Sequence, residues 1–454
     1  MSVATMNEKL TRIKTAVDRI RIATDTTGEV IENVASAVEN IAPLEEKDVN
    51  FYDYDGTLLY SYTLAEAQAL TELPPAPAHE GLTFQEWNWD LADIKAENDL
   101  VDIGATYITD NGDTRIYIEL PEDRLDPYLG IMGSGDIEVD WGDGSEKQTI
   151  TNSTSSVVKT QHIYPQKGKY VISLKPIQTA QIYINGSSGP YLIDDATHTG
   201  KGRAYWFCIK KIEIGKQVYF GGSYYYSQIF ANTGIETITI PNNVNINQSA
   251  TGFFQGCRQL VACVVPKGWT KITDYFLDGC TKLSCFCVPK SVTTLGSYSL
   301  ENTSTLKKII IPNSVVTVGG QAFRSMYSLK KVKFSSAMTS IPYALFQYEN
   351  AINEYKIPSN IINIGQQAFA QNYNLVKIEF LGSVTTIGSV PFQGCQGLKK
   401  ITFLNCTTVP TIPANSIPTV DDLQIVVPDA LYEDWIATSG WDTYASYIVK
   451  ASEV

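Results

Sequence analysis

The sequence lacks the features that define several broad classes of protein. None of its 454 residues belongs to an uninterrupted apolar run of about 18, so no membrane-spanning helix is predicted. Charged side chains interrupt the apolar positions of residues 1–22, and we therefore expect no signal peptide for export. Histidine occurs only three times, with no serine or cysteine nucleophile motif beside it. We expect a protein that is not an enzyme and that needs no cofactor.

Cysteine is absent from the first 200 residues. The eight cysteines lie in or beside a repetitive region that follows: Cys208, Cys257, Cys263, Cys280, Cys285, Cys287, Cys395 and Cys406. Cys257, Cys280 and Cys395 differ by whole multiples of 23, which is typical of small apolar side chains filling one layer of a repeat. Cys285 and Cys287 alternate along one predicted strand, but no histidine lies near them to complete a metal site. We expect free thiols, with a metal site or disulfides as the less favoured alternatives.

The net charge of −13 is distributed unevenly. Residues 43–150 hold 25 acidic and 5 basic side chains, whereas residues 201–420 hold 20 basic and 8 acidic ones. A basic region of this size attracts polyanions. Nucleic acid and an anionic polymer of a cell surface both meet this description, and the order of the domains described below favours the second.

A period of 23 residues organises the chain from about residue 235 to 404. Large aliphatic residues recur at equal steps: Leu260, Leu283, Leu306, Leu329, Ile352, Leu375 and Leu398. Phenylalanine keeps the same period at Phe323, Phe346, Phe369 and Phe392. A fixed period of about 20 to 29 residues with this apolar core indicates a leucine-rich solenoid, in which each coil buries its apolar face only against its neighbours.

Two copies of the repeat carry a more specific pattern. Residues 311–315 read Ile-Pro-Asn-Ser-Val and are followed by Gly-Gln-Ala-Phe at 320–323, and residues 357–369 repeat the pattern in variant form. It resembles the BspA-type leucine-rich repeat, over about half of the chain, and implies a solenoid across residues 201–420. The period fails after Leu404. Residues 423–428 then predict one strand and residues 430–437 and 443–449 predict helices, so that Trp435 and Trp441 seal the last coil in a cap over residues 421–454.

Within each coil, the strand turns alternate side chains toward the exposed face of a sheet. The predicted outward pairs include Ala262 with Val264 and Cys285 with Cys287, and the later pairs carry lysines that form a ladder. The ladder and an aromatic cluster near the start of the solenoid are candidate ligand-binding residues: Lys308, Lys331, Lys333, Lys356, Lys377, Lys400, Tyr219, Phe220, Tyr224, Tyr225 and Tyr226. Solubility of an open sheet is weighed above ligand contact as the explanation of the lysines, and capping of the first coil explains the aromatic residues equally well, so both alternatives stay open.

Two short amphipathic helices are predicted within residues 1–42. Their apolar stripes are Leu10, Ile13, Val17 and Ile20, and then Ile31, Val34, Val38 and Ile41. Such helices need a partner for their stripes, and we predict a homo-oligomer, with a trimer favoured; packing on the next domain is the alternative. The segment resembles the amino-terminal segments of tail and baseplate proteins from phages of Gram-positive hosts.

Residues 43–100 predict a small mixed module. Alternating runs on either side of Asp55-Gly56 indicate a hairpin, a helix covers residues 64–70, and residues 82–89 return as an aromatic strand. The ending at residues 80–87 resembles the Listeria–Bacteroides repeat, which implies a β-grasp fold. Asp53-x-Asp55-Gly56-Thr57 also matches the nucleophile motif of haloacid-dehalogenase-type phosphatases, but residues 60–200 lack the parallel α/β pattern of those enzymes, so the hairpin is preferred.

Residues 101–200 predict an all-β module, with strands at 115–120, 136–141, 157–164 and 170–174. Asp140-Trp141-Gly142-Asp143-Gly144, then His162-Ile163-Tyr164, resemble the PKD domain, which implies an immunoglobulin-like sandwich. We read His162 as a hydrogen-bonded structural residue rather than a catalytic base. A calcium ion between Asp140 and Asp143 is the open alternative at this turn.

Together these parts describe a multidomain, mainly β protein with a helical stem (1–42), a β-grasp-like module (43–100), a PKD-like sandwich (101–200), a solenoid (201–420) and a cap (421–454). This order resembles a phage tail or baseplate appendage, which implies a virion protein that attaches to a host-surface glycan or protein through the solenoid and contacts other tail proteins. Two alternatives are a structural connector that docks on another virion protein and a bacterial surface adhesin. Multivalent attachment through several weak sites is the expected mechanism.

Overall fold

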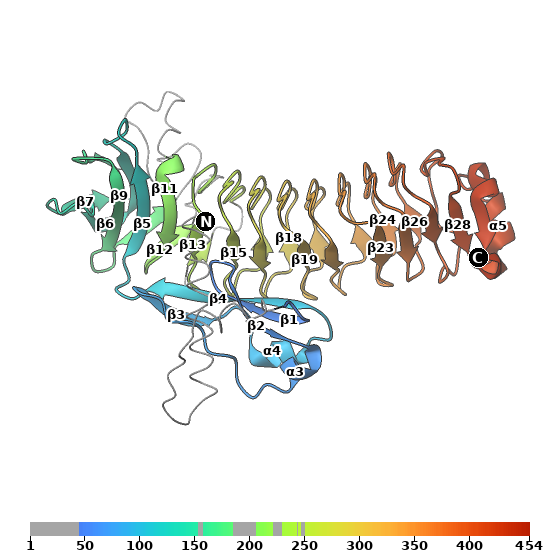
Figure 1. Cartoon of the computed structure of the whole chain (residues 1–454), viewed down its shortest axis with the longest axis horizontal. Helices are drawn as coiled ribbons and strands as arrows, with labels where there is room; N and C mark the ends of the chain where they lie inside the picture. The colour runs from blue at the N-terminus through green and yellow to red at the C-terminus, as the bar shows by residue number, and fades with distance from the viewer. Residues whose placement is uncertain (1–44, 153–157, 185–205, 221–228, 243, 247–249) are drawn as a thin grey trace, which may run out of the picture. The chain divides into compact units, whose positions relative to one another are not determined.

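The computed structural model describes residues 45–152, 158–184, 206–220, 229–242, 244–246 and 250–454 (Figure 1). The chain divides into two units, residues 1–46 and residues 47–454. The helices predicted within residues 1–42, with all eight residues assigned to oligomerisation, lie outside the described residues. Everything below concerns the second unit.

A four-stranded mixed sheet opens the second unit, in the order β2-β1-β4-β3. Its elements are β1 (Val49–Tyr52), β2 (Leu58–Tyr62), α3 (Leu64–Gln68), β3 (Leu82–Trp87), α4 (Leu91–Ala96) and β4 (Val101–Thr109). The predicted hairpin is confirmed, because β1 and β2 pair antiparallel and Gly56 takes the left-handed conformation that their turn requires (φ 85°). A capping box between Thr63 and Glu66 starts α3.

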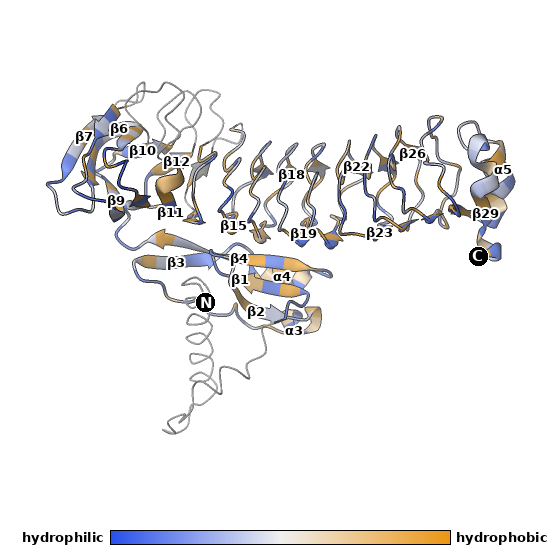
Figure 2. Ribbon diagram, turned by 45° about the horizontal axis from the view of Figure 1, so that its top comes forward, coloured by the Kyte–Doolittle hydropathy of each residue, from blue (hydrophilic) through white to orange (hydrophobic). Residues whose placement is uncertain are grey.

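The boundary expected at residue 100 falls inside this sheet. Strand β4 pairs in parallel with β1 and antiparallel with β3, so the first module extends to Thr109. All nine residues of β4 are buried, and Figure 2 shows the hydrophobic colour along β1 and β4. Residues 49–109, with the connecting segments, are called the N-terminal module from here on.

The next six strands include one at each of the four places predicted, with β7 and β10 in addition. They are β5 (Thr114–Leu120), β6 (Tyr128–Asp140), β7 (Gln148–Asn152), β8 (Val158–Gln161), β9 (Gly168–Pro176) and β10 (Gln181–Ile184). Trp141 stacks on His162 with ring centroids 4.8 Å apart, and Tyr164 donates its hydroxyl to the Trp141 carbonyl. His162 Nε2 lies 2.7 Å from Asp143 Oδ2, so the hydrogen bond predicted for this histidine is confirmed.

Asp143 is fully engaged at this turn. Its Oδ1 accepts from the backbone and hydroxyl of Ser145, and its Oδ2 faces His162. These hydrogen bonds lower the pKa of Asp143 to about 2 against the opposing effect of partial burial. The described residues contain no group of three or more potential metal ligands, and the calcium alternative gains no support from the geometry.

Strands β5 to β10 and the first strands of the solenoid share one sheet. Strand β11 (Ile209–Glu213) pairs antiparallel with β5 and parallel with β13 (Thr237–Thr239), while β12 (Val218–Phe220) pairs in parallel with β10 and with β14 (Asn245–Ile246). One hydrophobic core therefore runs from β5 to the C-terminal cap. The boundary expected at residue 200 separates no independent bodies, because strands β5 to β10 share a sheet and a core with the first coil of the solenoid.

The 23-residue period is confirmed strand by strand. One row of parallel strands carries the broad face: β15 (Ala262–Val264), β17 (Cys285–Cys287), β19 (Lys308–Ile310), β21 (Lys331–Lys333), β23 (Glu354–Ile357), β25 (Lys377–Phe380) and β27 (Lys400–Thr402). A second row is shorter: β16 (Lys271–Ile272), β18 (Thr294–Leu295), β20 (Thr317–Val318), β22 (Ser340–Ile341), β24 (Asn363–Ile364) and β26 (Thr386–Ile387). Lys308 pairs with Lys331 and Lys377 with Lys400, in register.

Between the rows, equivalent side chains stack from coil to coil. The Phe346, Phe369 and Phe392 rings lie 5.7 Å apart at each step. Cys257, Cys280 and Cys395 fill one buried layer as predicted, and each thiol donates to a backbone carbonyl of the preceding coil. All eight cysteines are free, and the Sγ atoms of Cys285 and Cys287 lie 3.6 Å apart.

The C-terminal cap covers the last coil. It consists of β28 (Gln424–Val427), η3 (Asp429–Leu431), α5 (Tyr432–Ala437), η4 (Asp442–Tyr447), β29 (Ile448–Lys450) and η5 (Ala451–Glu453). Trp435 and Trp441 are fully buried against Phe403, as predicted. The helix predicted over 443–449 is too long, because residues from Ile448 on join the sheet beside β28.

A carboxyl group lies inside the solenoid. Glu349 is fully buried; its Oε1 accepts the backbone N–H of Met326 at 2.6 Å, and its Oε2 has no hydrogen-bond partner among the described residues. Burial raises the pKa of Glu349 well above its usual value, although the Met326 N–H acts in the opposite direction. The proton therefore stays on this side chain in the folded state at a pH where the unfolded chain has lost it.

Glu349→Gln is expected to stabilise the protein above the ordinary carboxyl pKa of 4.5. The unfolded carboxyl ionises there while the folded one does not, so the wild-type free energy of unfolding falls as pH rises toward the folded pKa. Glutamine keeps an acceptor for Met326 and does not titrate, so we expect a gain of roughly 1–3 kcal/mol at pH 8. Urea unfolding of both proteins at pH 5 and pH 8 measures it. A difference between the proteins that is equal at the two pH values would contradict the assignment.

Candidate binding face

The outward side chains of the broad face change in kind along the solenoid. Ala262, Val264, Cys285 and Cys287 are apolar and buried, although they point away from the solenoid core. From Lys308 on, the outward positions carry mostly lysine and glutamate. The prediction that the first four lie on an exposed face is wrong, because the N-terminal module covers them.

The module makes an apolar contact with strands β15 and β17. Tyr52 and Leu58 pack on the four outward residues just named. The side chains of Asn88 and Trp89 donate to the Val265 and Val288 carbonyls, each at 2.9 Å. Gly104 lies so close that a Cβ at this position would come within 2.5 Å of the Val264 side chain. The contact is therefore a packed interface, and a larger residue at 104 would push the two surfaces apart.

A row of polar contacts runs along one side of this interface. Helix α4 and its two flanking residues meet three successive coils: Asp90 contacts Lys267 (2.6 Å), Asp93 contacts Lys290 (2.8 Å) and Glu97 contacts Asn313 (2.8 Å). Steps of three and four residues advance a helix by about 4.5 to 6 Å, and neighbouring strands lie about 4.8 Å apart. The distance along the helix between successive acidic residues thus matches the spacing of successive coils.

Lys308 makes the most buried charged contact of the interface. Its Nζ lies 2.8 Å from Asp102 Oδ1 and 2.8 Å from the Tyr52 hydroxyl, and the Lys308 and Asp102 side chains are 15% and 7% exposed. Asn50 donates to the same Asp102 oxygen at 3.1 Å. Lys308 is predicted as part of a ligand-binding ladder, but its ammonium group contacts side chains of the N-terminal module instead.

Asp53 sits inside the module rather than in an open cleft. It is buried, its Oδ1 accepts the Tyr54 backbone N–H, and its Oδ2 lies 2.8 Å from His79 Nε2. Its backbone N–H and carbonyl close the hairpin with Thr57 and Gly56. These contacts favour a structural role for the motif that resembles a phosphatase nucleophile.

The other predicted residues have different surroundings. Lys333 is buried beneath the module, and its Nζ donates to Asn313 Oδ1 at 3.1 Å. Phe220 is fully buried in the core, so the prediction that its ring is exposed is wrong. Tyr219 is half-buried beside Tyr183. Tyr224, Tyr225 and Tyr226 lie outside the described residues, and the aromatic cluster stays a prediction.

The coils of this face match a known family. Residues 204–307 and 296–416 match, in six copies, the model of the BspA type leucine rich repeat region. This part of the chain is a BspA-type leucine-rich repeat domain. No curated protein matches the chain. No helix of the described residues is long and apolar enough to cross a membrane.

Solved structures of similar fold include several bacterial proteins. A leucine-rich repeat protein from Bacteroides ovatus has 18% identity and a TM-score of 0.36, with 48% of this chain and 66% of that chain covered. A leucine rich cell surface protein from Faecalibacterium prausnitzii has 18% identity and a TM-score of 0.29, covering 54% and 74%. A T. pallidum leucine rich repeat protein has 18% identity and a TM-score of 0.28, covering 50% and 86%.

Beyond β19, and apart from Lys333, the N-terminal module leaves the outward positions of the BspA-type domain uncovered within the part of the chain that the structure describes. Lys331 and Lys356 are exposed, and Lys400 is half-buried. Lys377 lies 2.9 Å from Glu354 and 3.3 Å from Glu379, and the hydrogen bond to Glu354 is the main cause of its raised pKa. The outward positions of β21 to β27 outside the covered Lys333 thus hold four lysines and two glutamates, a surplus of positive charge.

Sequence reasoning missed the acidic residues that meet the BspA-type domain. Asp90, Asp93 and Glu97 follow a helical spacing, and the outward residues of β15 and β17 are apolar where those of the later coils are charged. The second feature was a usable signal, since an apolar pair on an otherwise polar sheet face indicates a covered surface.

Proposed function

We propose that this chain is a non-enzymatic attachment protein whose BspA-type domain binds an anionic surface through the uncovered strands β21 to β27. The contact with the N-terminal module supports the proposal: the three preceding coils hold acidic side chains through lysines, of which Lys267 and Lys290 are one 23-residue period apart. The face therefore suits an acidic ligand with regularly spaced charges. Such a ligand gains affinity from several weak sites that are engaged together.

The setting that we favour is a phage tail or baseplate appendage that attaches to a host-surface glycan or protein. The order of an oligomerising amino-terminal segment, two β modules and a terminal solenoid supports it, as does the resemblance of residues 1–42 to tail proteins. The sheet order β2-β1-β4-β3 supports a β-grasp module, and the packing of Trp141, His162 and Tyr164 supports a PKD-like sandwich. A virion connector and a bacterial surface adhesin use the same face and are the alternatives.

Charge reversal on the uncovered face is expected to weaken binding to an anionic polymer. Lys331→Glu with Lys356→Glu removes two exposed positive charges, and we expect roughly a tenfold loss of affinity for immobilised polygalacturonate at low salt. The binding should also weaken as salt is raised, because exposed charges are screened. Biolayer interferometry on the full chain measures both effects.

The control variant reverses two positive charges at positions outside the broad face. Lys271→Glu with Lys282→Glu lies off the broad face and should leave the affinity within about twofold, a small difference in free energy. Equal losses from the two double variants would point to net charge alone and refute the assigned face. Attachment of the full chain to whole cells, compared among the same variants, then separates a cell-surface ligand from a partner inside a particle.

A further inference from the structure

We propose that Lys333 and Asn313 join in an intramolecular amide bond, formed with Glu97 of the docked N-terminal module as the proton-transfer group. The three side chains come from separate places in the chain: the strand β21, the turn that follows β19, and the residue that ends α4. They meet only because the module lies on the BspA-type domain. The inference is independent of the proposed attachment function.

The amine and the carbonyl are in contact. Lys333 Nζ lies 3.1 Å from Asn313 Oδ1, and since a C=O bond is about 1.23 Å long, Nζ is no more than about 4.3 Å from the amide carbon. Reaction requires an approach to about 3–3.5 Å, which a small rotation of the flexible lysine chain supplies. The two residues are held by adjacent coils whose strands pair in register, so their separation is fixed by the fold.

The Asn313 amide is held and polarised from both ends. Its Oδ1 also accepts the backbone N–H of Ser336 at 3.1 Å, and its Nδ2 donates to Glu97 Oε2 at 2.8 Å. A backbone N–H can only donate and a carboxylate accepts, so these partners fix which end of the amide is oxygen. The Ser336 N–H is placed to stabilise negative charge on this oxygen, as an oxyanion-hole donor does.

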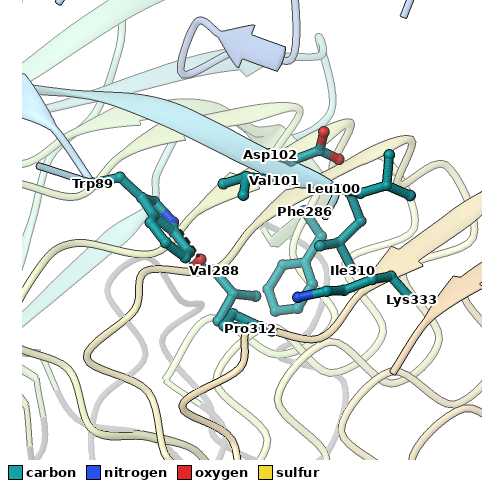
Figure 3. A pocket seen from close by; sticks show the side chains of 9 residues that line it. All are labelled: Trp89, Leu100, Val101, Asp102, Phe286, Val288, Ile310, Pro312 and Lys333. Carbon is teal, nitrogen blue, oxygen red and sulfur yellow. Dashed lines mark hydrogen bonds between the residues drawn. The ribbon is translucent and has the colours of Figure 1, made fainter. Parts of the chain in front are cut away.

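The surroundings favour an uncharged amine. Lys333 and Glu97 are each 5% exposed. Figure 3 shows the Lys333 chain reaching into a small cavity with a volume of about 10 Å³. Its lining is mostly apolar and includes Trp89, Phe286 and Pro312, with Asp102 as the acidic member. Burial lowers the pKa of Lys333 despite the acidic groups of Glu97 and Asp99. A neutral amine is the form that attacks a carbonyl.

The reaction is balanced without any other reagent. The lone pair of Lys333 Nζ forms a bond to the Asn313 amide carbon, and the oxygen takes negative charge beside the Ser336 N–H. Glu97 accepts a proton from Nζ and delivers one to Nδ2, as a general base and then a general acid. The carbon–Nδ2 bond breaks, ammonia leaves, and a secondary amide joins the two side chains.

The bond would form only in chains whose N-terminal module is docked on the BspA-type domain. Glu97 reaches Asn313 only when α4 lies along the coils, so a chain with a displaced module would keep a free lysine and a free asparagine. Once formed, the bond fastens two adjacent coils at the end of the covered region, where the uncovered face begins. Pulling on the uncovered coils would then not unpeel them from the coils beneath the module.

Intact-mass spectrometry of the purified full chain tests the proposal. We expect a mass lower than that of the sequence by one ammonia molecule, and after digestion a branched peptide that contains both Asn313 and Lys333, without trypsin cleavage after Lys333. Lys333→Met, Asn313→Ala and Glu97→Gln should each restore the full sequence mass. Lys331→Met, on the same strand but exposed, should keep the ammonia loss.

Two outcomes would overturn the proposal. One is a wild-type chain at full sequence mass with cleavage after Lys333, which would make the contact an ordinary hydrogen bond. The other is an ammonia loss that persists in Lys333→Met, which would place the reaction elsewhere. The wild-type measurement needs no variant to fold, and circular dichroism of Glu97→Gln separates loss of the bond from loss of structure.

Discussion

Asp102→Ala is expected to lower the free energy of unfolding by about 3–5 kcal/mol, because it removes the buried carboxylate that pairs with the Lys308 ammonium. Lys308 reaches Asp102 across the interface between the N-terminal module and the BspA-type domain, and both side chains are largely shielded from water. Tyr52 then remains as a neutral acceptor for Lys308, which offsets only part of the loss. Urea unfolding followed by tryptophan fluorescence measures the change, since Trp87 and Trp89 lie in the module.

Two comparisons make this result specific. Asp110→Ala removes an exposed partner of Arg115 and should cost much less than Asp102→Ala, because solvent screens the exposed pair. Asp102→Leu combined with Lys308→Met replaces the pair by apolar side chains and should recover most of the stability, because the cost of burying the charges disappears with them. If the double variant were as unstable as Asp102→Ala, the interface would depend on the shape of these side chains and not on their charges.

Local patterns along the chain predict the repetitive part of this protein well. The spacing of Leu306, Leu329 and Leu375 predicts stacked coils, and all three are buried in the one continuous core. Asp55-Gly56 predicts the β1–β2 hairpin because the turn has its own conformational requirement. Each of these features depends on residues close in sequence or on a fixed period, so one sequence is enough to reveal it.

The interface could not be predicted in this way, because it depends on where two distant surfaces meet. The contrast between an acidic N-terminal half and a basic solenoid is visible in the sequence, but it equally suits a solenoid that reaches an external polyanion. Pairing within the chain depends on the rise of helix α4, which matches the spacing of the coils. Asp90 and Asp93 therefore meet Lys267 and Lys290 in turn. Composition shows the opposite charges, and only the structure shows that they are paired.

The same limit applies to the start of the solenoid. Strand β11 pairs in parallel with the next coil strand, β13, and also pairs antiparallel with β5 of the preceding module. A solenoid needs its first and last coils covered. Here a neighbouring domain covers the first coil. The last coil is covered by Trp435 and Trp441, which follow it directly in the sequence and could be recognised there.

Trp441→Ala is expected to destabilise the C-terminal end of the BspA-type domain by about 3–5 kcal/mol, the usual cost of removing a fully buried tryptophan. The indole packs on Phe403 and Trp435, and its Nε1 donates to the Pro410 carbonyl at 2.7 Å. The loss should be local, since each coil contacts only its neighbours. Hydrogen exchange should show faster opening of β27, β28 and β29, with β15 and β17 unchanged.

The exposed Tyr373 supplies the control for this prediction. Tyr373→Ala removes a ring that is 46% exposed and should shift the stability by no more than about 0.5 kcal/mol. Uniform loss of protection across all coils in Trp441→Ala would show that the solenoid unfolds as one cooperative body, in which the cap and the N-terminal module stabilise the same transition. Loss confined to the last coils would show that the two ends are secured separately, with the module protecting the first coils whatever happens to the cap.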